Sequence, residues 1–262
     1  MKRAVLRIYE DEGAVNHNEK RGVMTMLRWV AQQYMTGLRG GSLEKNQRFM
    51  AFFFIPYLLI LVSVTSGFYD TVMGACCYYA LAIPMGVCFC MAFINPVRMP
   101  KLMYLCPLDQ SMRRDYIRGA CWFRIAVHTG LAVIGALVSL LFGNDWPGAL
   151  GSAFTTFLFS ILCIDMNGLA SPRNTVGGCM EHLGRMMVRF FGMVLAFILE
   201  EIFISAAQSG GILAQARWEQ ILISIMTAVT LLLSIRYMLY LKEMQEDALY
   251  YEKTYAHREE KC

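Results

Sequence analysis

Residues 121–142 read CWFRIAVHTGLAVIGALVSLLF, an apolar run of 22 residues that contains a single arginine. A helix rises about 1.5 Å per residue, so this run can cross a hydrocarbon core of about 30 Å. Five further apolar stretches of 19 to 23 residues accompany it, at 49–67, 72–94, 148–167, 187–207 and 219–241. Soluble domains seldom need even one such run, so the repetition predicts an all-α integral membrane protein with six transmembrane helices.

The basic residues predict how these helices are oriented. Of the 24 Lys and Arg, 20 fall in alternate connecting segments, at 1–48, 95–120, 168–186 and 242–262. The opposite loops are very short, and Arg217 is their only basic residue. Basic residues stay on the cytoplasmic side during insertion, so both termini are expected in the cytoplasm, in a multi-pass protein of a bacterial cell membrane.

Three arginines lie within the predicted spans, near their inner ends: Arg124, Arg189 and Arg236. A long side chain in that position can reach the headgroup phosphates, so we expect all three to snorkel to the membrane surface. His128 is the one histidine within a span, and a helix-packing role is expected for it.

Composition excludes several classes of protein. Hydrophobic residues make up 56% of the chain and charged residues 17%, and the net charge of +4 is concentrated in the cytoplasmic segments. That charge indicates membrane topology, so nucleic-acid binding is not expected. The chain divides into a cytoplasmic N-terminus (1–48), a membrane domain (49–241) and a cytoplasmic tail (242–262) that continues the sixth span into solvent. These segments leave no room for a separate catalytic or receptor domain.

The cysteines show no metal-site spacing. All nine lie in predicted spans or on the cytoplasmic side, where the reducing cytosol disfavours disulfides. Cys88 and Cys90 are separated by one residue and Cys76 and Cys77 are adjacent, whereas structural zinc sites use pairs separated by two residues. We therefore expect small packing residues and no bound metal.

Residues 23–39 have the pattern of an amphipathic helix. One helical stripe is mostly apolar and contains Val23, Met26, Leu27, Val30, Tyr34 and Leu38. The opposite stripe is polar and contains Thr25, Arg28, Gln32, Thr36 and Arg39. Such a helix is expected in the plane of the membrane interface with Trp29 at headgroup depth, or packed on other cytoplasmic segments.

The segment between the second and third runs predicts a short cytoplasmic helix. Pro107 suits a turn or a first helical position, and Asp109 or Ser111 can cap the helix that follows. Charged and apolar residues then alternate up to Ile117. This segment is either a basic loop that satisfies the insertion rule or a stiff element on which a soluble partner docks.

The segment Leu105 to Tyr116 resembles the leucine, proline, apolar, serine, arginine, acidic, tyrosine loop in the permease subunits of the type-two ATP-binding-cassette exporter family. The spacing is wider here, since Asp109 and Gln110 separate Leu108 from Ser111. The six-span layout, the cytoplasmic termini and the interfacial helix resemble that family as well. The resemblance implies a permease subunit that forms the substrate path of an exporter.

The same resemblance assigns partners and contact residues. In that family the loop after the second span carries a coupling helix, which docks on an ATPase subunit and transmits its movement. The resemblance places this helix at Pro107, Ser111, Arg113, Arg114, Asp115 and Tyr116. It further implies two ATPase subunits that bind ATP and Mg, and a second permease subunit that is either an identical or a related chain.

Catalysis by this chain is not expected. The sequence contains no G-x-x-x-x-G-K-[ST] nucleotide-binding loop, no H-E-x-x-H and no G-x-S-x-G motif. ATP hydrolysis is therefore expected on a separate polypeptide, and no cofactor is expected in this one. Two other functions have the same topology, namely a non-transporting membrane interaction or immunity protein and a proton-coupled carrier that uses Glu200 or Glu201.

Glu200 and Glu201 lie in the outward half of the fifth predicted span. Ionised carboxylates facing lipid there cost several kcal/mol, so these side chains are expected to face protein or water, or to be protonated. Adjacent helical residues project about 100° apart, so both can line one cleft only where the helix bends or ends. The family resemblance implies a re-entrant segment after the fifth span, here 202–216. The pair then lines an outer gate or substrate path, or else it ends the helix and reaches exterior water.

Overall fold

The computed structural model describes residues 28–35, 72–97, 99–105, 109–164, 166 and 176–250, and every regular element in this part of the chain is a helix. A helix at 28–35 comes first. It is followed by α3 (Val72–Ile94), α4 (Lys101–Leu105), α5 (Gln110–Leu141), α6 (Trp146–Leu162), α7 (Val176–Gln208), the 3₁₀ helix η1 (Ile212–Ala214) and α8 (Arg217–Asp247). The predicted all-helical fold is confirmed for these residues.

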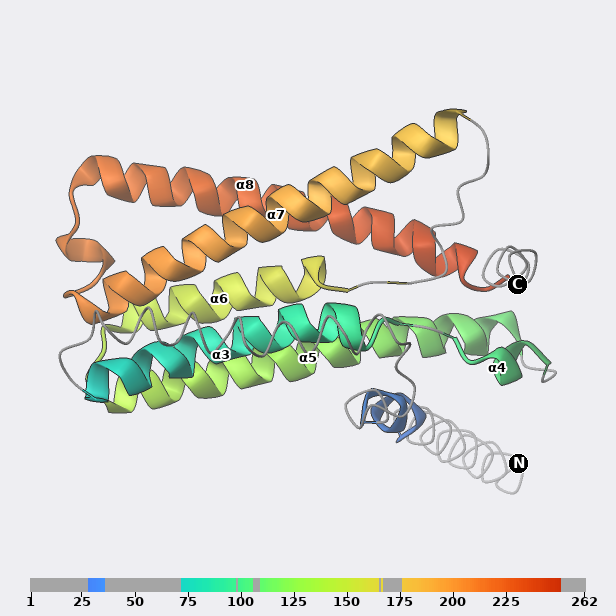
Figure 1. Ribbon diagram of the computed structural model, residues 1–262, viewed down its shortest axis with the longest axis horizontal. Helices are drawn as coiled ribbons and strands as arrows, with labels where there is room; N and C mark the ends of the chain where they lie inside the picture. Colours follow the sequence, from blue (N-terminus) through green and yellow to red (C-terminus); the bar gives the residue numbers. More distant parts are fainter. Residues whose placement is uncertain are drawn as a thin grey trace, which may run out of the picture.

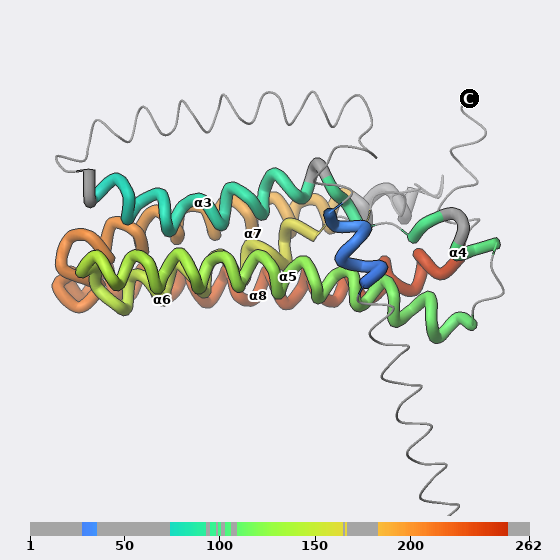
Figure 2. The backbone as a smooth tube through the Cα atoms, turned by 90° about the horizontal axis from the view of Figure 1, so that it is seen from below, coloured from blue at the N-terminus to red at the C-terminus, as the bar shows by residue number. Residues whose placement is uncertain are grey.

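The long helices lie alongside one another and alternate in direction, as Figure 1 and Figure 2 show. At one end of the bundle α5 turns into α6 and α7 turns into α8, and we call this the hairpin end (Figure 1). The start of α5 and the end of α8 lie at the opposite end with α4 and helix 28–35, and we call this the α4 end. Short connections force neighbouring helices to run antiparallel, which explains the alternation.

Among the described residues, four helices are long and apolar enough to cross a membrane, namely α3, α5, α7 and α8, and they indicate a membrane protein. They correspond to four of the predicted spans, and α5, α7 and α8 extend beyond the apolar runs. The predicted span 148–167 is shorter than expected, because α6 ends at Leu162 after 17 residues, or about 25 Å. The predicted span 49–67 lies outside the described residues.

The contact between α3 and α5 depends on a proline and a glycine. Pro84 lies inside α3 and has no N–H group, so it cannot bond to the carbonyl of Ala80 one turn earlier. Gly135 of α5 packs against this carbonyl so closely that a Cβ atom at position 135 would lie 2.1 Å from the Ala80 oxygen. The lack of a side chain at Gly135 therefore allows the two helices to approach this closely.

The contact between α6 and α7 is equally close near the hairpin end. A Cβ atom at Gly148 of α6 would lie 2.6 Å from the backbone nitrogen of Ala207 in α7. The backbone N–H of Asp145 donates to the Ala207 carbonyl at 2.9 Å, which ties the start of α6 to the end of α7. Small residues at helix contacts let backbones pack closely in lipid, where the hydrophobic effect does not drive helices together.

The largest apolar cluster lies towards the α4 end, and it includes the residues just past α8. Ala248 and Leu249 are buried in this cluster with Tyr116 and Ile117 of α5. The hydroxyl of Tyr104 in α4 donates to the Ala248 carbonyl at 2.5 Å. The prediction that the sixth span continues into solvent is therefore wrong for residues 248 and 249, because their apolar side chains are buried against α4 and α5.

Gly135→Ala should destabilise the bundle by about 1–3 kcal/mol, because the added methyl group must separate α5 from α3. Gly130 provides a matched control on the same helix, since nothing lies within 4 Å of a Cβ atom built there. Gly130→Ala should be neutral or stabilising by up to about 1 kcal/mol through helix propensity. Thermal unfolding midpoints in detergent micelles distinguish the two, and equal midpoints would contradict the close contact.

Candidate functional site

The predicted glutamate pair lies within an unbroken helix. α7 continues past Glu200 and Glu201 to Gln208, and the chain turns only at Gly210 and Gly211 before η1. A break at residue 202 does not occur, so the helix has no bend or end that would turn both carboxylates into one cleft. Each glutamate instead faces a different neighbouring helix.

Glu200 is buried between α7 and α6, with 2% of its surface exposed. The hydroxyl of Ser152 in α6 donates to its Oε1 at 2.5 Å, and its Oε2 has no hydrogen-bond partner among the described residues. The thiol of Cys88 in α3 lies close enough to interact electrostatically with it. Glu200 therefore does not reach the exterior.

Glu201 is half-buried and faces α3. The hydroxyl of Tyr78 lies 3.1 Å from its Oε1 and 3.3 Å from its Oε2, so one donor serves both oxygens. We call Glu200, Glu201, Ser152 and Tyr78 the acidic centre. Its two carboxyl groups connect α7 to two separate helices near the hairpin end.

A second polar group forms around Arg124 of α5, which is 5% exposed. Its Nη2 donates to the main-chain oxygens of Asn95 and Pro96 at 3.0 and 3.2 Å and to the Asn95 side chain at 3.2 Å. Its Nη1 donates to the Ala120 carbonyl at 3.3 Å. The prediction that Arg124 snorkels is wrong, because these carbonyls, left free where α3 ends, bind its guanidinium inside the protein.

Helix 28–35 docks on this arginine. Tyr34 lies with its ring 6.0 Å from the Arg124 guanidinium, and its hydroxyl lies 3.2 Å from Nε2 of His128. The Asn95 side chain donates to the Tyr34 carbonyl at 3.1 Å. We call Arg124, Asn95, His128 and Tyr34 the arginine centre. Burial raises the pKa of Tyr34 against the opposing effect of Arg124, so its hydroxyl stays protonated at neutral pH.

The amphipathic pattern of this segment is confirmed where it is described. Val30 and Tyr34 of the apolar stripe are buried, whereas Arg28 and Gln32 of the polar stripe are exposed. The buried stripe contacts protein, because Val30 belongs to the apolar cluster at the α4 end and Tyr34 packs edge-on against Phe123. The rest of the predicted helix 23–39 lies outside the described residues.

Five of the six predicted coupling residues lie in the first two turns of α5, a continuous helix of 32 residues. Asp109 occupies the N-cap position without a side-chain cap bond, and Pro107 lies outside the described residues. Ser111 and Asp115 are exposed, but Tyr116 is 1% exposed and donates to the side-chain oxygen of Gln33. Tyr116 therefore binds the N-terminal helix of its own chain.

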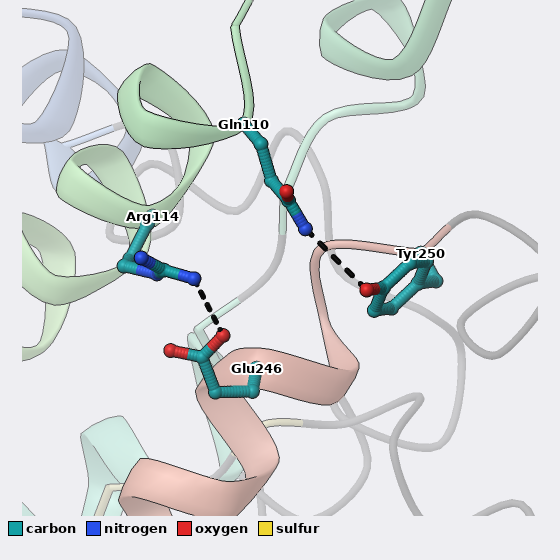
Figure 3. A network of polar contacts seen from close by, with 4 residues as sticks. All are labelled: Gln110, Arg114, Glu246 and Tyr250. Atoms are coloured by element: carbon teal, nitrogen blue, oxygen red, sulfur yellow. Dashed lines mark hydrogen bonds and ion pairs between the residues drawn. The ribbon is translucent and has the colours of Figure 1, made fainter.

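The two predicted coupling arginines also contact their own chain. Arg114 forms an ion pair of 2.9 Å with Glu246 at the end of α8, and Gln110 donates to the Tyr250 hydroxyl at 3.4 Å nearby (Figure 3). Arg113 donates to the Tyr104 carbonyl and lies over its ring at 5.7 Å. These contacts fix the start of α5 to α8 and α4.

Side chains from α7 and α8 bind the C-terminal end of α6, an arrangement that the sequence pattern did not predict. The Nε of Arg189 donates to the Leu162 carbonyl at 3.0 Å, and the hydroxyl of Tyr237 donates to the Ile164 carbonyl at 2.9 Å. The snorkelling prediction is therefore wrong for Arg189 as well. Arg236 is exposed and lies 4.6 Å from the Tyr240 ring, a position that allows snorkelling.

Metal ligands do not gather in the described part of the chain. No group of three His, Cys, Asp or Glu side chains there is arranged to hold a metal ion. Free thiols are found at Cys76, Cys77, Cys88, Cys90, Cys121 and Cys163. His128 packs between α5 and helix 28–35, in agreement with the predicted packing role.

Arg124→Lys should loosen the arginine centre, because a lysine keeps the charge but lacks the forked N–H groups that reach several carbonyls. Hydrogen bonds to charged groups contribute about 1.5–3 kcal/mol, so backbone hydrogen exchange at residues 28–35 should accelerate about tenfold or more. Mass spectrometry of the protein in lipid nanodiscs measures this exchange. Arg236→Lys is the control on α8 and should leave the exchange rate of residues 28–35 unchanged. Equal exchange rates in both variants would contradict the role of Arg124.

Comparison with known proteins assigns this chain to no family. No protein-family model, no curated protein and no solved structure matches it. The two polar centres and the exposed start of α5 are therefore the features from which a function is inferred.

Proposed function

We propose that this chain is the membrane-spanning permease subunit of an ATP-binding-cassette exporter in a bacterial cell membrane. In this proposal six helices cross the bilayer, with 49–67 as the first, and both termini and the α4 end lie in the cytoplasm. The distribution of basic residues supports this orientation. Helix 23–39 lies at the cytoplasmic interface, where the exposed Trp29 side chain suits headgroup depth.

The length of α5 is the observation that carries this proposal. Its 32 residues extend about 48 Å, whereas a hydrocarbon core is about 30 Å thick. One continuous helix therefore contains both a membrane span and a charged start that projects beyond it. A force applied to that start would move the span, because the two parts share one hydrogen-bonded backbone.

One face of this projecting start is available for an ATPase subunit. Ser111, Asp115 and Arg118 are exposed and follow the spacing that places residues on one side of a helix. Met112 beside them is 51% exposed. A charged face with an apolar residue suits docking on a soluble protein surface. The partner ATPase subunits would bind ATP and Mg, and this chain would bind neither.

The opposite face of the same helix start contacts the rest of the chain, and these contacts explain how movement would spread. Arg114 pairs with Glu246 of α8, and Arg113 contacts Tyr104 of α4. Tyr116 binds helix 28–35 through Gln33. A coupling movement of α5 would therefore carry α8, α4 and the N-terminal helix with it, in line with a rigid-body switch between inward and outward access.

A second permease subunit, identical or related, would complete the substrate path. Glu200 and Glu201 would line its outer part or form its outer gate, since they connect α7 to α6 and α3 near the hairpin end. Separation of these helices would open the path on that side. The Met and Phe content, 19 and 16 residues, suits an amphipathic or lipid-like cargo.

Purification in mild detergent tests the coupling role. The wild-type chain should carry a stoichiometric ATPase subunit, and the double variant Asp115→Arg with Arg118→Glu should reduce the recovered ATPase about tenfold or more, since both docking charges are reversed. Quantitative mass spectrometry of the purified complex measures the ratio. Because the variant side chains are exposed, insertion and the amount of permease should not change.

A matched control reverses the same pair of charges at the hairpin end. Arg217 is exposed and Glu219 is half-buried there, and Arg217→Glu with Glu219→Arg should leave the ATPase ratio unchanged. Full ATPase recovery with both double variants would remove the start of α5 from the coupling role. A wild-type chain that reproducibly lacks an ATPase would favour the non-transporting interaction or immunity protein.

A further inference from the structure

Two buried oxygen atoms along the contact between α6 and α7 lack hydrogen-bond partners among the described residues. One is Oε2 of Glu200, and the other is the hydroxyl oxygen of Thr156, whose side chain is fully buried. Thr156 lies one helical turn beyond Ser152, so both point from the same face of α6 towards α7. Buried polar atoms are nearly always paired, so the unpaired oxygen of the buried Glu200 carboxyl group indicates a bound group.

The charges around Glu200 restrict what that group is. α3 and α6, the helices packed against its carboxyl group, contain no basic residue. Their nearest titratable groups are the Tyr78 hydroxyl and the Cys88 thiol, and Glu201 adds another carboxyl on α7 itself. α8 contacts this part of α7 through apolar side chains, including Ile223. No described cation is therefore available to balance an ionised Glu200.

We propose that Glu200 is a proton-binding site, which holds a proton while α6 and α7 are packed together and releases it when they separate. The proton is bound covalently at one carboxyl oxygen, and Ser152 donates to the other at 2.5 Å. A neutral carboxylic acid avoids the large cost of an unpaired buried charge. It also turns one carboxyl oxygen from an acceptor into a donor.

Release follows from the same geometry. When α6 and α7 separate, water reaches Glu200, the O–H bond breaks, its electron pair remains on the carboxylate and the proton passes to water. The separated state is therefore favoured as pH rises, since only the packed state requires the bound proton. This inference goes beyond the exporter proposal and stands without it, because it depends only on the contact between α6 and α7.

Infrared spectroscopy of the full chain, in a detergent that contains no carbonyl groups, tests the bound proton directly. A protonated carboxyl group gives a C=O stretching band above the amide I band, whereas ionised carboxylates do not. The wild-type protein at neutral pH should show this band, and Glu200→Gln should abolish it. Glu201→Gln is the matched control on the adjacent residue and should retain the band. Absence of the band in the wild type, or its persistence in Glu200→Gln, would overturn the proposal.

A second variant keeps the test decisive if Glu200→Gln does not insert. Ser152→Ala retains the carboxyl group but removes the hydroxyl that donates to it, so the band should persist and move to higher frequency. An unmoved band would show that the protonated group is not the one bound to Ser152, and the assignment to Glu200 would be lost.

Thiol labelling tests the link between proton release and helix separation. Cys88 is fully buried near Glu200, whereas Cys76 on the same helix is exposed. The ratio of Cys88 to Cys76 labelling by a membrane-permeant maleimide should rise with pH by up to about tenfold per unit in the wild type. Ionisation of the thiols can also raise the labelling ratio with pH. This contribution remains in Glu200→Gln, so that variant provides the baseline. An equal pH dependence in both proteins would refute proton-linked separation.

Discussion

The buried main-chain carbonyl groups at the helix ends of this bundle require hydrogen-bond donors from neighbouring helices, because their own helix has no further N–H group for them. α3, α6 and α8 all end in the direction of the α4 end, and each uses a side chain from another helix. Arg124 binds the carbonyls after α3, Arg189 binds the last carbonyl of α6, and Tyr104 binds the carbonyl of Ala248 after α8. These hydrogen bonds connect neighbouring helices, whereas water would bind each of these carbonyl groups without connecting any helices.

This requirement also links the N-terminal helix to the membrane helices. Arg124 belongs to α5, binds the end of α3 and lies beneath Tyr34 of helix 28–35. A movement of α5 must therefore either carry these elements or break several bonds to a buried charge, which costs about 1.5–3 kcal/mol for each bond. In the proposed exporter, α5 and its neighbours would respond to the ATPase as one unit at the α4 end.

The acidic centre has a different chemistry and lies nearer the hairpin end. Its carboxyl groups bond to hydroxyl groups of Ser152 and Tyr78, neither of which carries a compensating charge. Arginines therefore stabilise helix ends towards the α4 end, whereas neutral hydroxyl groups stabilise glutamates nearer the hairpin end. If the acidic centre forms the outer gate of the proposed exporter, its neutral hydrogen bonds let it open without separating an ion pair, which suits a membrane interior where separated charges are costly.

The sequence by itself determined the helical class and the positions of four described apolar helices. It also determined the amphipathic pattern of helix 28–35 and the presence of an acidic pair in α7. These features follow from run length and periodicity, which are local properties of the chain. Only the tertiary structure decided which polar groups meet. Tyr34 and His128 are 94 residues apart and Arg114 and Glu246 are 132 apart, so no local pattern pairs them. The snorkelling prediction failed for Arg124 and Arg189 for the same reason. It assumed that the membrane surface was the nearest polar region that these side chains could reach. Neighbouring helix ends supplied acceptors at a shorter distance, and their position depends on how the helices pack.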